Sequence, residues 1–204
     1  MPMEIPLSEE DKRRIEAGIR EKYARVAITP EGLFKYPSGR AGLEALHYDP
    51  DILRTLPPKA LDSFCGVGNP FSLGPIAEGE SVLDLGSGGG VDSMVAAGLV
   101  GPSGKVVGLD LSPEMVARAR ENLQETEFTQ LEFRDFSGEK LPFPDERLDV
   151  VISNGVFNLI PEKAGMLKEV FRVLKPGGRL MIADQVLTGE LPLDTKSRVE
   201  SWSG

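Results

Sequence analysis

From Ser81 onwards, short apolar runs alternate with longer segments whose apolar residues recur at helical spacing. A short apolar run predicts a buried strand, and helical spacing predicts an amphipathic helix. The runs predict strands at about 81–86, 105–110, 130–135, 148–153 and 179–185. The segments between them predict helices at about 91–99, from Ser112 onwards, and at about 162–174. This alternation predicts an α/β fold, a doubly wound and mostly parallel sheet with helices on both faces.

The first 79 residues follow a different pattern. Ser8 is a candidate N-cap for an amphipathic helix over about 8–27. Its apolar residues are Ile15, Ile19, Tyr23 and Val26. Residues 28–79 carry many prolines and glycines and predict short helices between turns. We therefore divide the chain into an N-terminal helical cap or lid segment, 1–79, and a core, 80–204. The pattern leaves open whether the first helix only packs against the core or covers a binding site as a lid.

Composition narrows the class of protein. A chain of 204 residues suits one α/β domain, and a net charge of −9 disfavours nucleic acid as a partner. The only cysteine, Cys65, excludes an intramolecular disulfide, and the only histidine, His47, argues against a zinc cluster, so we expect no metal. No signal peptide and no apolar run long enough to span a membrane are evident. These features predict a cytoplasmic protein that binds neither nucleic acid nor membrane.

The most informative segment is the glycine-rich turn after the first predicted strand. Asp84, Gly86, Gly88 and Gly90 follow one another at every second position, and Asp110 ends the next apolar run. A glycine turn followed by an acid is how an open α/β sheet holds an adenosine cofactor, because bare backbone approaches the ligand and the carboxylate binds the ribose hydroxyls. A dinucleotide site needs a third glycine where this chain has Val91, so that pattern fails.

The glycine turn resembles the first motif of class I S-adenosylmethionine-dependent methyltransferases. Further stretches resemble the same family in the same order: Arg134–Phe136, Asp145–Val151, Ser153–Leu159 and Leu174–Leu180. The resemblance implies that Asp84 serves the ammonium side of the cofactor, Asp135 and the Phe136 backbone meet the adenine, and the loop of Asn154 and Val156 meets the methionine end. The expected cofactor-binding residues are Asp84, Gly86, Ser87, Gly88, Gly90, Asp92, Asp110, Leu111, Met115, Asp135, Phe136, Asn154 and Val156.

Within that family the chain is most similar to the arsenite methyltransferase branch. The similarity rests on the segments 66–70, 84–93 and 153–161. Family members that methylate arsenite hold As(III) with several thiolates, since a soft metalloid prefers soft ligands. This chain has Gly155 and Val67 where the family has cysteines, and Cys65 is displaced by two positions. We therefore carry over the cofactor site without the arsenic site, and interpret Cys65 as a small buried residue.

The resemblance also implies a longer sheet. Related folds commonly end in two antiparallel edge strands, and the residues from Val186 to Gly204 are too few for a helix and two strands. We expect these C-terminal edge strands to be missing, which leaves an open sheet edge through which a homo-oligomer could form.

Several functions remain open from the sequence. The first is methyl transfer from S-adenosyl-L-methionine to a small-molecule acceptor, with S-adenosyl-L-homocysteine as product. The alternatives are arsenite methylation assisted by external thiols, or binding of the cofactor without turnover. Displacement at a sulfonium needs alignment more than a catalytic side chain, so no catalytic residue is assigned.

Overall fold

The computed structural model describes residues 7–186 and Trp202. Its centre is one sheet of five strands in the order β3-β2-β1-β4-β5, and every neighbouring pair is parallel. The strands are β1 (Ser81–Leu85), β2 (Lys105–Asp110), β3 (Leu131–Asp135), β4 (Leu148–Asn154) and β5 (Leu174–Ala183). The predicted α/β class and parallel sheet are confirmed. The chain order reverses between β1 and β4, and in such sheets ligands bind outside the carboxyl ends of the strands at this point.

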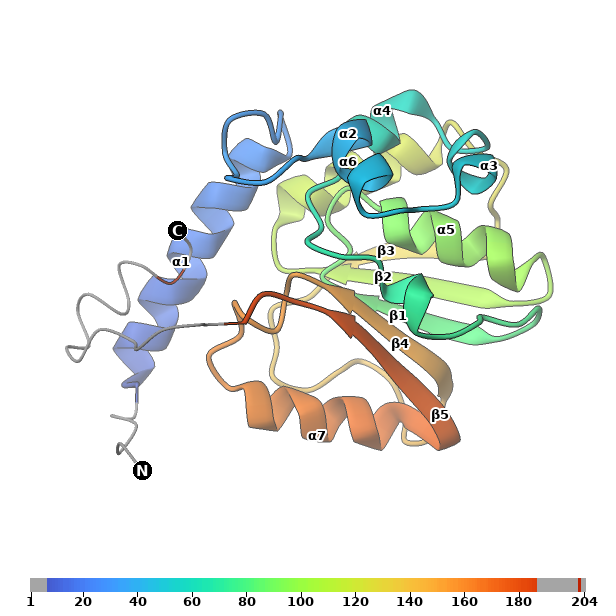
Figure 1. Cartoon of the computed structure of the whole chain (residues 1–204). Helices are drawn as coiled ribbons and strands as arrows, with labels where there is room; N and C mark the ends of the chain where they lie inside the picture. Colours follow the sequence, from blue (N-terminus) through green and yellow to red (C-terminus); the bar gives the residue numbers. More distant parts are fainter. Residues whose placement is uncertain (1–6, 187–201, 203–204) are drawn as a thin grey trace.

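Helices cover both faces of the sheet (Figure 1). One face carries α5 (Val91–Val100) and α6 (Pro113–Leu123), with α2 (Gly39–Ala45), α3 (Pro50–Leu53), α4 (Pro58–Asp62) and the short helix η1 (Pro70–Leu73) outside or beside them. The opposite face carries α7 (Lys163–Val173). This is the doubly wound arrangement that the alternating pattern predicted.

The strands alternate their side chains between two hydrophobic clusters. Val82 of β1 and Val150 of β4 lie in the cluster beneath α5, whereas Leu83 and Val151 lie in the cluster beneath α7. Successive strand residues point to opposite faces, so a fully apolar strand is buried from both sides. Leu43, Leu61 and Phe64 of the N-terminal segment belong to the first cluster as well. Residues 39–64 therefore complete the core as well as flanking the site.

The first helix, α1 (Glu9–Val26), lies beside the carboxyl ends of the strands (Figure 1). Ser8 and Asp11 form a capping box, with the Asp11 amide donating to Ser8 Oγ at 3.1 Å and the Ser8 amide donating to Asp11 at 3.0 Å. Such a box satisfies two backbone donors at the helix start. The ammonium of Lys12 pairs with Glu162, just before α7, at 2.8 Å. This ion pair connects the first helix to the loop before α7, at the same end of the sheet.

The last described strand differs from its prediction. The pattern placed a turn at Lys175–Gly178 and began the strand after it, but β5 begins at Leu174, which pairs with Leu148. Pairing then shifts, so that Val150 faces Arg179 and the residues between form an irregularity within the ladder, with Gly177 at φ +81°. The residues expected to form a turn therefore lie inside β5, because their place depends on tertiary pairing that the sequence pattern does not show. The prediction that the C-terminal edge strands are missing concerns residues after 186. These residues, except Trp202, lie outside the described part of the chain.

Candidate functional site

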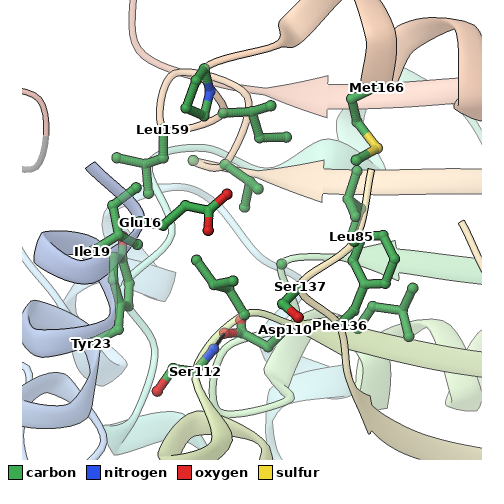
Figure 2. A pocket seen from close by; sticks show the side chains of 18 of the residues that line it. Glu16, Ile19, Tyr23, Leu85, Asp110, Ser112, Phe136, Ser137, Leu159 and Met166 are labelled. Carbon is green, nitrogen blue, oxygen red and sulfur yellow. Dashed lines mark hydrogen bonds between the residues drawn. The ribbon is translucent and has the colours of Figure 1, made fainter. Parts of the chain in front are cut away.

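A cavity of about 590 Å³ opens at the carboxyl ends of β1, β2, β3 and β4. Its walls come from α1, from the turns after these strands and from the start of α7 (Figure 2). The volume lies within the usual range for small-molecule sites, roughly 300–1,000 Å³. Trp202 supports one wall, because its indole N–H donates to the Leu159 carbonyl at 2.9 Å.

The glycine-rich turn forms the floor beneath the cavity. The amide of Gly86 donates to the Leu109 carbonyl at 2.7 Å and its φ is +81°, a region that L side chains rarely adopt. A Cβ at this position would overlap the side chain of Val156, so the turn and the loop after β4 approach each other only because residue 86 has no side chain. The bare backbone of Gly86 and Gly88 is left facing the cavity.

Asp110 joins the glycine turn to the start of α6. Its Oδ2 accepts a hydrogen bond from the Gly88 amide at 2.8 Å, and its Oδ1 accepts one from the Ser112 amide at 2.9 Å. Burial raises the pKa of this carboxyl, while the backbone donors act in the opposite direction. The carboxylate lines the cavity at the end of β2, where an acid can accept hydrogen bonds from two vicinal hydroxyls.

Asn154 at the end of β4 lies at the centre of a polar network. Its Nδ2 donates to Asp92 Oδ2 at 2.9 Å and to the Gly68 carbonyl at 2.8 Å, and its Oδ1 accepts from the amides of Val67 and Gly68 at 2.8 and 3.1 Å. Tyr48 donates from its hydroxyl to Asp92 Oδ1 at 2.7 Å. The network links β4, α5 and the loop before η1, and so fixes the wall that carries Cys65.

The two buried carboxyls behind this wall have altered titration. Burial raises the pKa of Asp92 to about 6, against donors from Asn154 and Tyr48 that favour its charged form. Asp84 is 1% exposed, accepts a hydrogen bond from the Ser93 hydroxyl at 2.6 Å, and has its pKa raised well above the ordinary value by burial and by the nearby Asp92. Both acids support the turn from behind and do not line the cavity.

The structure brings together about half of the residues expected to bind a cofactor. Those that line the cavity are Gly86, Gly88, Asp110, Leu111, Phe136, Asn154 and Val156. Those that lie behind or beside it are Asp84, Ser87, Gly90, Asp92, Met115 and Asp135. The direct contacts expected of this second set are therefore not supported by their positions.

The remaining residues of the second set are surrounded by other parts of the protein or by solvent. The Ser87 hydroxyl is buried and lacks a partner among the described residues. A Cβ at Gly90 would lie 2.6 Å from the Phe133 ring, and one at Gly88 would lie 3.3 Å from the buried Met115 side chain. Asp135 is exposed at the strand end and lies 3.8 Å from Arg120. These positions shape the turn and its packing.

The sequence analysis did not assign several of the residues that line the cavity, and four of them lie on α1. Lys12, Glu16, Ile19 and Tyr23 all line the cavity and follow one another at spacings of four, three and four residues. This is one stripe of a helix, so the amphipathic pattern already held the signal. The pattern does not show which part of the core this stripe of the helix faces. Further missed residues are Ser137, Leu159, Ile160 and Met166.

Cys65 also lines the cavity, which corrects its interpretation as a simple core residue. It is half-buried, and burial raises the pKa of its thiol to about 12, with the negative charges of Asp110 and Asp92 acting in the same direction. The thiol is therefore protonated at neutral pH. Across the described residues, no group of three or more His, Cys, Asp or Glu is placed to hold a metal ion.

Comparison with known proteins identifies the family. The model of the methyltransferase domain family matches residues 76–204. The chain is 38% identical over 215 residues to the arsenite methyltransferase of Halobacterium salinarum, an alignment that covers 98% of this chain and 55% of that protein. It is 41% identical over 141 residues to the arsenite methyltransferase of Aquipseudomonas alcaligenes, covering 64% and 40%. The chain thus spans about half the length of the curated relatives it matches.

Solved structures agree with this result. A S-adenosylmethionine-dependent methyltransferase from Aquifex aeolicus superposes with a TM-score of 0.54 at 26% identity, over 80% of this chain and 81% of that chain. The arsenic(III) S-adenosylmethionine methyltransferase from Chlamydomonas reinhardtii superposes with a TM-score of 0.55 at 33% identity, over 73% and 50%. The chain belongs to the methyltransferase domain family. In its described part, no helix is both long and apolar enough to cross a membrane.

Proposed function

We propose that this chain binds S-adenosyl-L-methionine in the cavity at the carboxyl edge and directs its methyl group to a small-molecule acceptor. The observation that carries the proposal is Asp110, which faces the cavity while it holds the glycine turn through the Gly88 amide. An adenosine ligand needs this combination of a carboxylate and bare backbone. Phe136 follows β3 directly and lines the cavity, and because its amide donates to the Asp110 carbonyl at 2.8 Å, we propose that the adenine ring packs against its side chain.

The charge of the cavity supports a cofactor without phosphates. Its single basic lining residue in the described chain is Lys12, whose ammonium pairs with Glu162 at 2.8 Å and with Glu9 at 2.7 Å. A pyrophosphate would therefore lack a free cation, and Val91 takes the place of the third glycine of a dinucleotide turn. A sulfonium and an ammonium group suit carboxylate-lined walls better. These features favour S-adenosylmethionine over a nicotinamide dinucleotide.

When bound, this cofactor supplies a methyl group on a positively charged sulfur that leaves readily as a neutral thioether. The residues of the chain then have two tasks, alignment of the acceptor and exclusion of water. Ile19 and Tyr23 of α1 face the cavity from the side opposite Leu85 and Phe136, as a lid would (Figure 2). We therefore assign the lid role to α1, within the N-terminal segment 1–79.

The test is transfer of a labelled methyl group from S-adenosylmethionine to a panel of small acceptors. We expect turnover with at least one acceptor, and loss of turnover together with loss of cofactor affinity in Asp110→Ala. Tight binding of S-adenosylhomocysteine without turnover of any acceptor would favour the alternative of a binding protein that performs no chemistry.

A second candidate function is methylation of arsenite with external thiols. Two observations favour it, the similarity to proteins named arsenite methyltransferases and the position of Cys65 on the cavity wall. One thiol supplies one of the several soft ligands that As(III) prefers, so glutathione would have to supply the rest. Turnover that requires both arsenite and glutathione, and that Cys65→Ser abolishes, supports this reading over the first.

The setting and partners are part of the proposal. The net charge of −9 disfavours nucleic acid, and the single cysteine suits a reducing cytoplasm. In the described residues β5 pairs with β4 alone, so its outer edge is available to a second copy of the chain.

A further inference from the structure

One carboxylate in the cavity, that of Glu16, has no hydrogen-bond or ion-pair partner in the described part of the chain. Glu16 lies in the middle of α1, and its side chain points into the cavity between Leu159 and Asp110 (Figure 2). Within residues 7–186 and Trp202, no hydrogen bond or ion pair engages it. Its position on the helix stripe with Ile19 places it beside apolar walls. A half-buried charge without a partner costs free energy. The Glu16 carboxylate therefore indicates a ligand that carries a positive charge or a hydrogen-bond donor to pair with it.

The other charged groups of the cavity already have partners or lie in solvent. Lys12 is held by Glu162 and Glu9, and Asp110 accepts two backbone hydrogen bonds. Glu139 is exposed. The described lining therefore has an excess of negative charge and no cation free to balance it.

Neighbouring groups respond to this environment. The pKa of the Cys65 thiol and that of the Tyr23 hydroxyl are both raised, first by burial and then by surrounding negative charges that include Asp110. Both groups are neutral at neutral pH, so neither competes with Glu16 for a cation. The same field disfavours acceptors that carry a carboxylate or a phosphate.

We infer that Glu16 receives the basic nitrogen of the methyl acceptor, and that the acceptor is an amine on an apolar body. The inference rests on the proposed function. The apolar body fits the walls formed by Ile19, Leu159 and Met166. The ammonium fits Glu16 through a charge-assisted hydrogen bond, which is roughly twice as strong as a neutral one.

The pairing also provides the proton transfer that amine methylation needs. The acceptor ammonium gives one proton to the Glu16 carboxylate, which frees the nitrogen lone pair. The nitrogen then forms a bond to the methyl carbon while the carbon–sulfur bond breaks and its electron pair stays on sulfur. The products are a methylated ammonium, a neutral thioether and a protonated Glu16, which releases its proton to water.

The experiment measures binding of three probes that share one apolar body. 2-Phenylethylamine, 2-phenylethanol and 3-phenylpropanoate are titrated by calorimetry into the full chain saturated with S-adenosylhomocysteine. We expect the wild type to bind the amine about 10-fold more tightly than the alcohol, and the propanoate more weakly than either. Glu16→Gln should bind the amine and the alcohol with equal affinity. Glu21→Gln removes a charge from the exposed side of the same helix and should keep the preference.

The ammonium of the cofactor carries the same charge as an acceptor amine, so a second arm separates the two sources. S-Adenosylhomocysteine and 5′-methylthioadenosine, which lacks the amino-acid part, are titrated into wild type and Glu16→Gln. If Glu16 serves the acceptor, the variant binds both nucleosides as the wild type does. A roughly 10-fold loss for S-adenosylhomocysteine alone assigns Glu16 to the cofactor and overturns the inference.

The remaining outcomes are also decisive. A wild type that binds S-adenosylhomocysteine but shows no preference for the amine, or binds none of the three probes, overturns the inference and leaves the proposed function intact. A wild type that does not bind S-adenosylhomocysteine removes the proposed function itself.

Discussion

Asn154 and Asp92 share a hydrogen bond of 2.9 Å between Nδ2 and Oδ2, although 62 residues separate them in the chain. The bond joins the carboxyl end of β4 to the first turn of α5. The Oδ1 of Asn154 also accepts hydrogen bonds from the amides of Val67 and Gly68. One side chain thereby holds three segments at the back of the cavity, and Asp92 acts as a positioning residue for it.

The pH dependence of stability tests this arrangement through Asp92→Asn. Burial raises the pKa of Asp92 in the folded protein to about 6, above the ordinary 3.8. The folded state therefore favours the protonated carboxyl. This contribution to stability is complete below pH 3.8, falls as pH rises, and is lost above about pH 6. At pH 7.5 the ionised carboxyl should destabilise the fold by on the order of 1–3 kcal/mol.

The amide variant cannot ionise, so its free energy of unfolding should improve relative to wild type between pH 4.5 and 7.5. Urea denaturation of both proteins at the two pH values measures this difference. The comparison cancels carboxyls remote from Asp92, such as Glu80 and Glu169, whose pKa values are lowered by arginine partners. It does not cancel Asp84, whose pKa Asp92 raises, so the measured difference belongs to this buried pair. A difference between the proteins that does not change with pH would contradict the buried titration.

Asp110→Ala should weaken S-adenosylhomocysteine binding by about 1–3 kcal/mol, because ligand hydroxyls and the Gly88 amide lose their acceptor. The matched control is Asp135→Ala, which removes an exposed acid from the end of the next strand, outside the cavity. Calorimetry should show a loss for the first variant and an unchanged affinity for the second. An equal loss in both would return Asp135 to the site that the sequence resemblance expected.

Gly86→Ala should abolish cofactor binding and destabilise the fold, because a Cβ there overlaps Val156. Gly177→Ala is an unusually close control, since both glycines have φ +81° but nothing lies within 4 Å of a Cβ at position 177. The control should cost only about 1–2 kcal/mol of stability and leave binding unchanged. Thermal denaturation and calorimetry measure both effects, and normal binding by Gly86→Ala would refute the close approach.

Cys65 should react slowly with iodoacetamide at pH 8, because the pKa of its thiol is about 12 and the thiolate is the reactive form. Raising the pH should accelerate the reaction, and S-adenosylhomocysteine should slow it by filling the cavity. Cys65→Ser should leave cofactor affinity unchanged. Fast labelling at pH 8 would indicate a thiolate and favour the arsenite reading.

The sequence predicted the centre of the sheet well because β1, β2 and β4 are buried on both faces and read as nearly continuous apolar runs. The glycine turn and Asp110 were also visible, since only glycine tolerates the conformation of residue 86. The burial of Asp84 and Asp92 was not visible, because a strand-end acid that faces a cavity and one that is buried share the same sequence pattern. Burial and partners, such as Ser93 for Asp84, decide between them only in three dimensions.

The orientation of α1 also could not be predicted from the sequence. The stripe of Ile19 and Tyr23 was recognised as amphipathic, but periodicity does not say which surface a helix covers. Glu16 lies on the same stripe, but a pattern of apolar residues does not distinguish a carboxylate that faces a cavity from one that faces solvent. Its meaning comes from the cavity it faces and from the absence of a partner within the described residues.

The most direct test of the account is a calorimetric titration of the chain with S-adenosylhomocysteine, with NAD as the comparison ligand. The account predicts binding of S-adenosylhomocysteine in the micromolar range or tighter, and none of NAD. Binding of NAD, or of neither ligand, would contradict the assignment of the cavity to S-adenosylmethionine.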